Sequence, residues 1–382
     1  MPLRYLIWAG LAFVFLPLAG FGLWLATLPA TPRAFSPPLV PQAEADVMLA
    51  ALKPPKRARP LVAIIGLNDS TETTDYLMPT GILRRADIAD VVMLSTRPGP
   101  VRLYPALTVE ADMTMEAFDA RHPEGPDYVV VPAMSRDDDP AVMAWLRKQA
   151  EGGAVIIAVC AGAKVVAAAG LLDGRRATTH WYYLEDLLGS RPSIRYVTDR
   201  RMVIDRGVAT TTGITASMPM MLTLVEAIAG RGKAEAVARD LGLDRWDARH
   251  DSGAFRLTRS FATTVLGNRL AVWSEDRFGI ALEPGLDEVS LALVADAWSR
   301  TYRSRVELLA TAMGAVTTRS GVRLIPDRVT AAAGERLPHG WASKRPTEAL
   351  GAALQLIGAR YGQATAHVVA MQLEYPRPGT AS

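Results

Sequence analysis

The sequence is poor in the residues that build disulfides and metal sites. It has one cysteine, Cys160, in 382 residues, which excludes an internal disulfide. It has no CxxC or HExxH motif. The five histidines are scattered, at positions 122, 180, 250, 339 and 367. We therefore expect no metal and no cofactor.

The sequence also has little net charge. Lys and Arg number 42 against 39 Asp and Glu, which leaves a net charge of +3. No basic stripe interleaved with aromatic residues is present, so we expect no nucleic-acid partner. The hydrophobic content of 49% is typical of a globular protein, and the length allows two domains.

Charge is absent from the amino-terminal run Tyr5–Leu28, which Arg4 and Arg33 bracket. At ~1.5 Å per residue the run covers ~36 Å, enough to cross a hydrocarbon core of ~30 Å. The sequence after it is a poor signal-peptide cleavage site. We therefore predict a single-pass membrane protein with an uncleaved anchor over 1–30. The flanking charges favour a periplasmic body only weakly, and a cytoplasmic body is the alternative.

A proline-rich linker, 31–60, precedes the folded body. Five apolar runs predict buried strands, and two amphipathic segments between them predict helices. The strands are Leu61–Gly66, Asp90–Ser95, Val101–Tyr104, Asp127–Pro132 and Ala154–Val159, and the helices are Asp75–Ala86 and Ala141–Glu151. The alternation predicts an α/β domain, 61–245, with a parallel sheet covered on both faces.

Cys160 follows the last of these strands directly and precedes a helical segment rich in small residues. Such a turn places the thiol at the carboxyl edge of a sheet, beside the free N–H groups of a helix start. That setting lowers a thiol pKa and supplies hydrogen-bond donors to an oxyanion. The alternative is a small apolar side chain packed in the core.

An internal repeat is also indicated. Residues 221–241 align with 353–373 without gaps, with Gly230 matching Gly362. Val101-Arg-Leu-Tyr-Pro105 matches Val322-Arg-Leu-Ile-Pro326 upstream of each. We predict that 250–382 is a degenerate partial copy of the domain that packs on it as an intramolecular pseudo-dimer. Chance similarity of amphipathic helices is the alternative, and a homodimer is a further possibility.

The stretch from Val159-Cys-Ala-Gly-Ala163 to Ala177-Thr-Thr-His-Trp181 resembles the ThiJ/PfpI family, whose fold is like that of class I glutamine amidotransferases. The resemblance is to its isonitrile-hydratase and AraC-type-regulator branch. It implies a flavodoxin-like three-layer fold with a nucleophile elbow.

The resemblance also implies a site. Cys160 matches the elbow cysteine, Asp75 the acidic residue that hydrogen-bonds it, and His180 the Thr-Thr-His motif. Asp75 could instead cap its helix, and His180 could be structural. The substrate would meet Ala133, Met134, Ala161 and Gly162.

The sequence departs from the family at three points. Many members have Gly-Gly where this chain has Ala133-Met134, and Met134 would crowd an oxyanion there. Ala161 follows the cysteine, where protease-like members have His. No helix-turn-helix pair follows the first domain, which disfavours direct action on DNA.

We therefore expect a membrane-anchored protein whose cysteine acts on a small molecule as a hydrolase or hydratase. In that reading Cys160 attacks an electrophilic carbon and Asp75 handles the proton. The alternatives are a small-molecule or redox sensor without turnover, and a purely structural pseudo-dimer scaffold.

Overall fold

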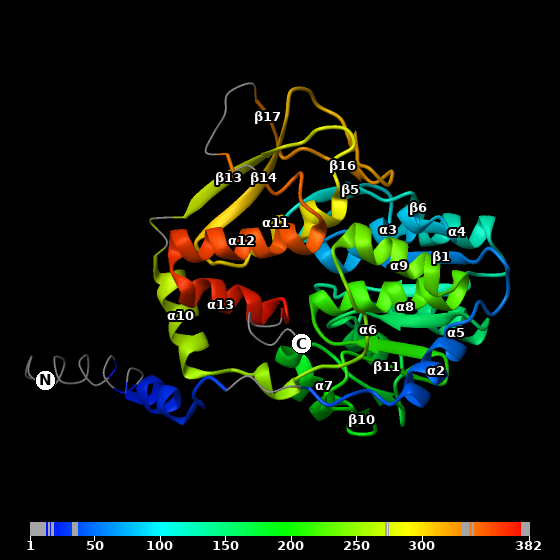
Figure 1. Ribbon diagram of the computed structural model, residues 1–382, viewed down its shortest axis with the longest axis horizontal. Helices are drawn as coiled ribbons and strands as arrows, with labels where there is room; N and C mark the ends of the chain where they lie inside the picture. The colour runs from blue at the N-terminus through cyan, green and yellow to red at the C-terminus, as the bar shows by residue number, and fades with distance from the viewer. Residues whose placement is uncertain are drawn as a thin grey trace, which may run out of the picture.

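The computed structural model describes residues 13, 16, 19–32, 37–271, 273, 275–330, 336–337 and 340–375. The chain forms two adjoining parts (Figure 1). One is built on a seven-stranded sheet, and the other contains a small sheet and the helices at the carboxyl end.

The seven-stranded sheet has the order β11-β12-β8-β7-β1-β3-β6. All neighbours are parallel except β11 and β12. The central order β3-β1-β7-β8-β12 is the flavodoxin-like arrangement, so the predicted fold class is confirmed as a mixed rather than purely parallel sheet. The strands are β1 (Leu61–Gly66), β3 (Asp90–Ser95), β6 (Met113–Thr114), β7 (Tyr128–Val131), β8 (Val155–Ala158), β11 (Met202–Asp205) and β12 (Val208–Thr211).

Apolar residues are buried on both faces of this sheet, because the side chains of each strand alternate between two separate core clusters. One face is covered by α2 (Gln42–Ala51), α3 (Thr73–Ala86), α8 (Ser217–Ala229) and α9 (Arg231–Leu241). The other is covered by α4 (Met115–Arg121), α5 (Pro140–Glu151), α6 (Gly162–Ala168) and α7 (Leu184–Ser190). The predicted strands and helices of the first domain therefore form within one or two residues of their expected bounds.

Predicted strand Val101–Tyr104 forms as β4 but joins a different sheet. That sheet has the order β15-β16-β5-β4-β2 and connects the two parts of the chain, because β16 pairs with β5. Its strands are β2 (Thr71–Glu72), β4 (Val101–Tyr104), β5 (Thr108–Glu110), β15 (Val316–Thr317) and β16 (Arg323–Leu324).

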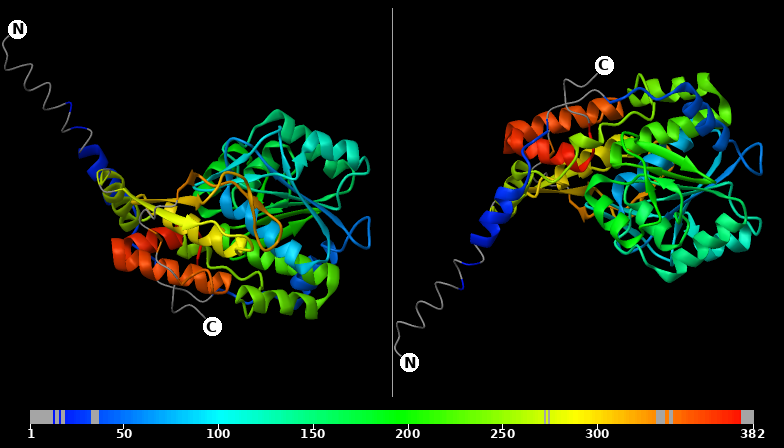
Figure 2. Two further views of the ribbon diagram at one scale, coloured as in Figure 1. Left: turned by 90° about the horizontal axis from the view of Figure 1, so that it is seen from above. Right: turned by 90° about the horizontal axis from the view of Figure 1, so that it is seen from below.

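The carboxyl-terminal part holds a second parallel pair with a helix between its strands. These are β13 (Asp276–Ala281), α11 (Glu288–Ser299) and β14 (Ser304–Ala310), with β17 (Arg328–Val329) at the edge. The remaining helices are α10 (Arg259–Leu270), α12 (Pro346–Tyr361) and α13 (Gln363–Gln372). In both views of Figure 2, α12 and α13 lie beside the first part.

Helix α11 packs against α3 of the first part, and two ion-pair sets cross this contact. Arg85 reaches Asp287 at 2.9 Å, and Arg300 reaches Glu72 at 2.8 Å. Arg300 lies as many positions after Arg85 as Asp287 lies after Glu72. One shift along the sequence therefore relates the two ion pairs to each other. The two parts therefore share one continuous interior, which the larger core cluster spans.

The predicted membrane anchor requires a correction. Among the residues described here, no helix is both long and apolar enough to cross a membrane, a task that takes about 20 residues. This finding contradicts the predicted single-pass membrane localisation with a periplasmic or cytoplasmic body. Of the predicted span Tyr5–Leu28, residues 5–12, 14, 15, 17 and 18 lie outside the described residues.

Candidate functional site

Cys160 lies at a sharp turn between β8 and α6, as predicted. Its φ of 56° is in the left-handed region, which is uncommon for a residue other than glycine. The turn presses against the neighbouring strand: a Cβ at Gly162 would lie 2.0 Å from the carbonyl oxygen of Val131. Only glycine fits this approach. Gly162 therefore has a packing role, in addition to the substrate contact predicted for it.

The backbone of the elbow is held by two threonines. The Cys160 N–H donates to Thr211 Oγ1 at 3.1 Å, and Thr179 Oγ1 donates to the Cys160 carbonyl at 3.1 Å. The N–H of Ala161 lies where it stabilises a thiolate, since its hydrogen bond lowers the pKa of Cys160. Cys160 is only 4% exposed, so the elbow is largely shielded from solvent.

The net pKa shift of Cys160 is opposite to the expected one. Burial raises its pKa well above the ordinary value, and the charges of Asp75, Glu72 and Glu374 raise it further. The Ala161 N–H opposes this shift but is the smallest of these influences. The prediction that a helix start lowers this pKa is therefore wrong, because desolvation and three nearby carboxylates outweigh one amide.

Asp75 lies in the first turn of α3 and is completely buried. Its Oδ2 accepts a hydrogen bond from the Ala133 N–H at 3.1 Å, and its Oδ1 has no hydrogen-bond partner. Burial first, and the charge of Glu72 second, raise its pKa well above the ordinary range. The cap of α3 is Glu72 rather than Asp75, so the helix-cap alternative for Asp75 is wrong. A buried carboxyl with one unpartnered oxygen holds a proton readily.

Ala133 and Met134 do not form an open oxyanion site. The Ala133 N–H is taken by Asp75, and its carbonyl accepts a hydrogen bond from the Glu72 N–H. Met134 packs against the core cluster on the face of the sheet opposite to that of Cys160. Ala133 therefore orients Asp75. Met134, which was expected to crowd an oxyanion, packs against the other core cluster from that of Cys160.

His180 lies against the last residue of α13. Its Nε2 is 2.9 Å from the Gln372 carbonyl, and its Nδ1 accepts from the Tyr182 N–H at 3.1 Å. Burial lowers its pKa, which favours the neutral ring. Both ring nitrogens are thus engaged in fixing local structure, which is the geometry that the structural alternative for His180 requires.

A buried charge cluster that was not predicted supports Asp75. Glu72 Oε2 accepts from the Asp75 N–H at 2.6 Å, while its Oε1 pairs with Arg300 at 2.8 Å. Arg300 also binds both carboxylate oxygens of Asp296, at 2.8 and 2.9 Å. The signal in the sequence is the equivalent spacing of Arg85 and Arg300, which lie outside the aligned segments 221–241 and 353–373. The carboxyl-terminal part thus supplies a cation to the Cys160 site.

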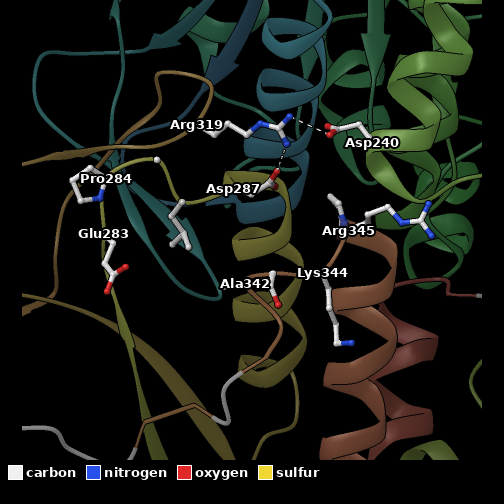
Figure 3. A pocket seen from close by; sticks show the side chains of 12 residues that line it. Asp240, Glu283, Pro284, Asp287, Arg319, Ala342, Lys344 and Arg345 are labelled. Carbon is white, nitrogen blue, oxygen red and sulfur yellow. Dashed lines mark hydrogen bonds and ion pairs between the residues drawn. The ribbon is translucent and has the colours of Figure 1, made fainter.

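Cys160 lines neither of two cavities that the described residues enclose. The smaller, of about 470 Å³, is lined by Asp240, Asp287 and Arg319 among others (Figure 3). Arg319 pairs there with Asp240 at 3.1 Å and Asp287 at 3.3 Å. The larger, of about 800 Å³, lies between the first part and α12 and α13.

Comparison with known protein families gives a match within the first part. The family model for the DJ-1/PfpI family matches residues 62–227. Residues 250–382 lie outside this match, so it does not support the predicted second copy.

Curated relatives differ in the length that they share with this chain. The HTH-type transcriptional regulator CdhR of Pseudomonas aeruginosa is 31% identical over 54% of this chain and 60% of its own. Isonitrile hydratase of Pseudomonas putida is 40% identical over 27% of this chain and 44% of its own. The chain thus spans about half the length of these two relatives. The Parkinson disease protein 7 homolog of Danio rerio is 30% identical over 47% of this chain and 95% of its own. From the elbow, the sheet order and these matches together, the chain belongs to the DJ-1/PfpI family.

Proposed function

We propose that Cys160 and Asp75 form a thiol–carboxyl pair that hydrates or hydrolyses a small uncharged molecule with an electrophilic carbon. The observation that carries the proposal is Asp75, completely buried beside the elbow with Oδ1 unpartnered. A carboxyl in that state is a general acid that works at neutral pH. The isonitrile hydratase among the relatives suggests the first substrate to try.

The proposed reaction has two steps. The Cys160 sulfur forms a bond to the electrophilic carbon, while the Asp75 proton goes to the substrate atom that gains the electron pair. The thiol proton passes to the Asp75 carboxylate, so Asp75 is protonated again and one proton has moved from the pair to the substrate. Water then attacks the same carbon and the carbon–sulfur bond breaks. One proton of the water returns to the thiol, and the other stays on the product. The net change is the addition of one water.

The test is conversion of a simple alkyl isonitrile to its N-substituted formamide, followed by NMR. We expect product with the unaltered chain and none above background with C160A or D75N. The matched variant E116Q changes an acidic residue in the first turn of α4 and should leave the rate unchanged. Product formation that survives C160A would refute the proposed role of the thiol.

A second function is favoured by the shielded thiol. Cys160 is 4% exposed and its pKa is raised, which suits a binding module that does not turn over. In that case an isonitrile or another small ligand stabilises the fold against heat without yielding product. Stabilisation without product in the same samples would favour this function over the first.

We also propose that 250–382 is a degenerate partial repeat that takes the place of a second subunit. Three features support it. Helices α12 and α13 meet at Gly362 with φ 89°, as α8 and α9 meet at Gly230 with φ 84°. The strands of β13-α11-β14 are parallel like those of β1-α3-β3, and Arg85 and Arg300 make equivalent ion pairs across the contact. Sedimentation should then give a monomer, and a stable homodimer through α3 would contradict the proposal.

A further inference from the structure

The larger cavity, of about 800 Å³, has the size of a small-molecule site. It lies between the loop that follows α9, the start of α8, and the helices α12 and α13 with the residues after them. In Figure 1 these elements meet between the red and green helices. Its walls are more apolar than polar, with a few charged groups among them. It is separate from the Cys160 elbow, which does not line it.

One end of the cavity carries a buried anion. Glu374 is 4% exposed, and its Oε1 accepts a hydrogen bond from the Trp181 N–H at 2.8 Å. Its Oε2 has no hydrogen-bond partner, and His250 Nε2 lies 3.5 Å away. Burial lowers the pKa of His250, so the ring is neutral at neutral pH and gives no compensating charge.

The Glu374 side chain is also firmly placed. A Cβ at Gly213 would come within 2.6 Å of its Cγ, so the chain packs directly on the Gly213 backbone. The backbone of Glu374 has a φ of 48°, and its carbonyl accepts from Thr215 Oγ1 at 2.8 Å. A carboxylate held this way is preorganised to receive a cation.

A second charge faces the same cavity. The Arg201 Nε donates to the Arg249 carbonyl at 2.6 Å, and in the described part of the chain no carboxylate forms an ion pair with its guanidinium. The nearby Asp247 is already paired with Arg249 at 2.6 Å. Burial lowers the pKa of Arg201, and the charge of Glu374 opposes this shift only in part. Arg201 and Glu374 do not form an ion pair with each other. The cavity therefore holds an anion and a cation that are not directly paired.

The remaining wall is suited to an apolar or cationic body. His250 and Phe255 stack with centroids 5.2 Å apart and planes at 3°. Met218 and Pro219 add apolar surface at the start of α8. Aromatic faces attract ammonium groups, and the buried carboxylate lies beside this stack.

We propose that this cavity binds a small zwitterion, whose cationic nitrogen pairs with Glu374 and whose carboxylate pairs with Arg201. A zwitterion neutralises both groups at once, whereas an ion of one sign leaves the other charge buried and unpaired. The site is distinct from the one that the proposed function uses, so either can fail without the other.

The test is a thermal-shift titration of the full chain, followed by calorimetry of any binder. The probes are the standard amino acids and 5-aminopentanoate, at up to about 10 mM. Pentanoate and pentylammonium, each with one of the two charges, are the matched single-charge probes. We expect at least one zwitterion to raise the Tm and to bind at least about 10-fold more tightly than either single-charge probe.

Variants then locate the site. E374Q and R201Q should each weaken binding about 10- to 100-fold, because each removes one charged partner. E235Q changes a carboxylate of α9 that does not line the cavity and pairs with Arg231 at 3.2 Å, and it should leave the affinity unchanged. G351L fills the cavity from α12, where a Cβ would meet only Tyr375 Oη at 4.0 Å, and should abolish binding while the fold is kept.

Several results would overturn the proposal. One is a Tm that no zwitterion raises, and another is equal binding of pentanoate or pentylammonium. Binding that persists in G351L would place the ligand elsewhere, and this variant decides the matter if E374Q does not fold. Isonitrile conversion measured in R201Q and G351L reports on the Cys160 site separately, whereas E374Q also removes a charge that raises the pKa of Cys160.

Discussion

Replacing Arg300 by glutamine tests how much the carboxyl-terminal part contributes to the Cys160 site. The Arg300 side chain is 12% exposed, and it holds Asp296 and Glu72 with contacts of 2.8 Å each. R300Q leaves two buried carboxylates without their cation. Removing one partner of a buried ion pair costs ~3–5 kcal/mol, because the remaining charge is neither solvated nor paired.

Urea unfolding of R300Q, followed by circular dichroism, should therefore show a free energy of unfolding lower by ~3–5 kcal/mol. The control is R319Q, which also removes an arginine with two carboxylate partners. The Arg319 side chain is 49% exposed, so its loss should cost less than ~1 kcal/mol. The double variant E72Q/R300Q should recover part of the loss, because it removes one stranded charge.

R300Q should also affect the site at a distance. Glu72 would keep its charge beside Asp75, and the pKa values of Asp75 and Cys160, which that charge already raises, should rise further. Alkylation of Cys160 should then be slower at a given pH. A loss below ~1 kcal/mol, or a loss equal to that of R319Q, would refute the reasoning that Arg300 compensates buried charge.

Two further predictions concern Asp75 and the elbow. The pKa of Asp75 is higher in the folded state than its unfolded value of about 4. Above that pH the folded state keeps a proton that the unfolded state has lost, so the free energy of unfolding falls as the pH rises. D75N should not show this loss. The difference in unfolding free energy between the unaltered chain and D75N should therefore fall from pH 4 to pH 8, and a difference that stays constant would contradict the prediction. G162A should destabilise the fold by more than ~2 kcal/mol, because its Cβ would meet the Val131 carbonyl. G232A in α9 is the control, and it should be neutral or stabilising because the space around its Cβ is open. Equal urea midpoints for the two variants would show that the elbow is not tightly packed.

The sequence predicted most of the first domain, because its strands are apolar runs buried on both faces. The elbow was predictable for the same reason: β8 ends at Cys160, and small residues follow it. The direction of the Cys160 pKa was not, because it depends on Glu72 and Glu374, which come from distant segments. The pairing of Arg300 with Glu72 joins two helices far apart in the chain, and no local pattern indicates it. The apolar run near the amino terminus led to a wrong localisation, since hydropathy alone does not establish a spanning helix.

The dependence of Cys160 alkylation on pH tests the central claim most directly, namely that Cys160 and Asp75 form one electrostatic unit. Iodoacetamide is a suitable probe because Cys160 is the only cysteine. The account predicts a thiol pKa above the ordinary value of ~8.5 in the unaltered chain and a lower value in D75N. A pKa at or below ~8.5, or one that D75N leaves unchanged, would contradict it.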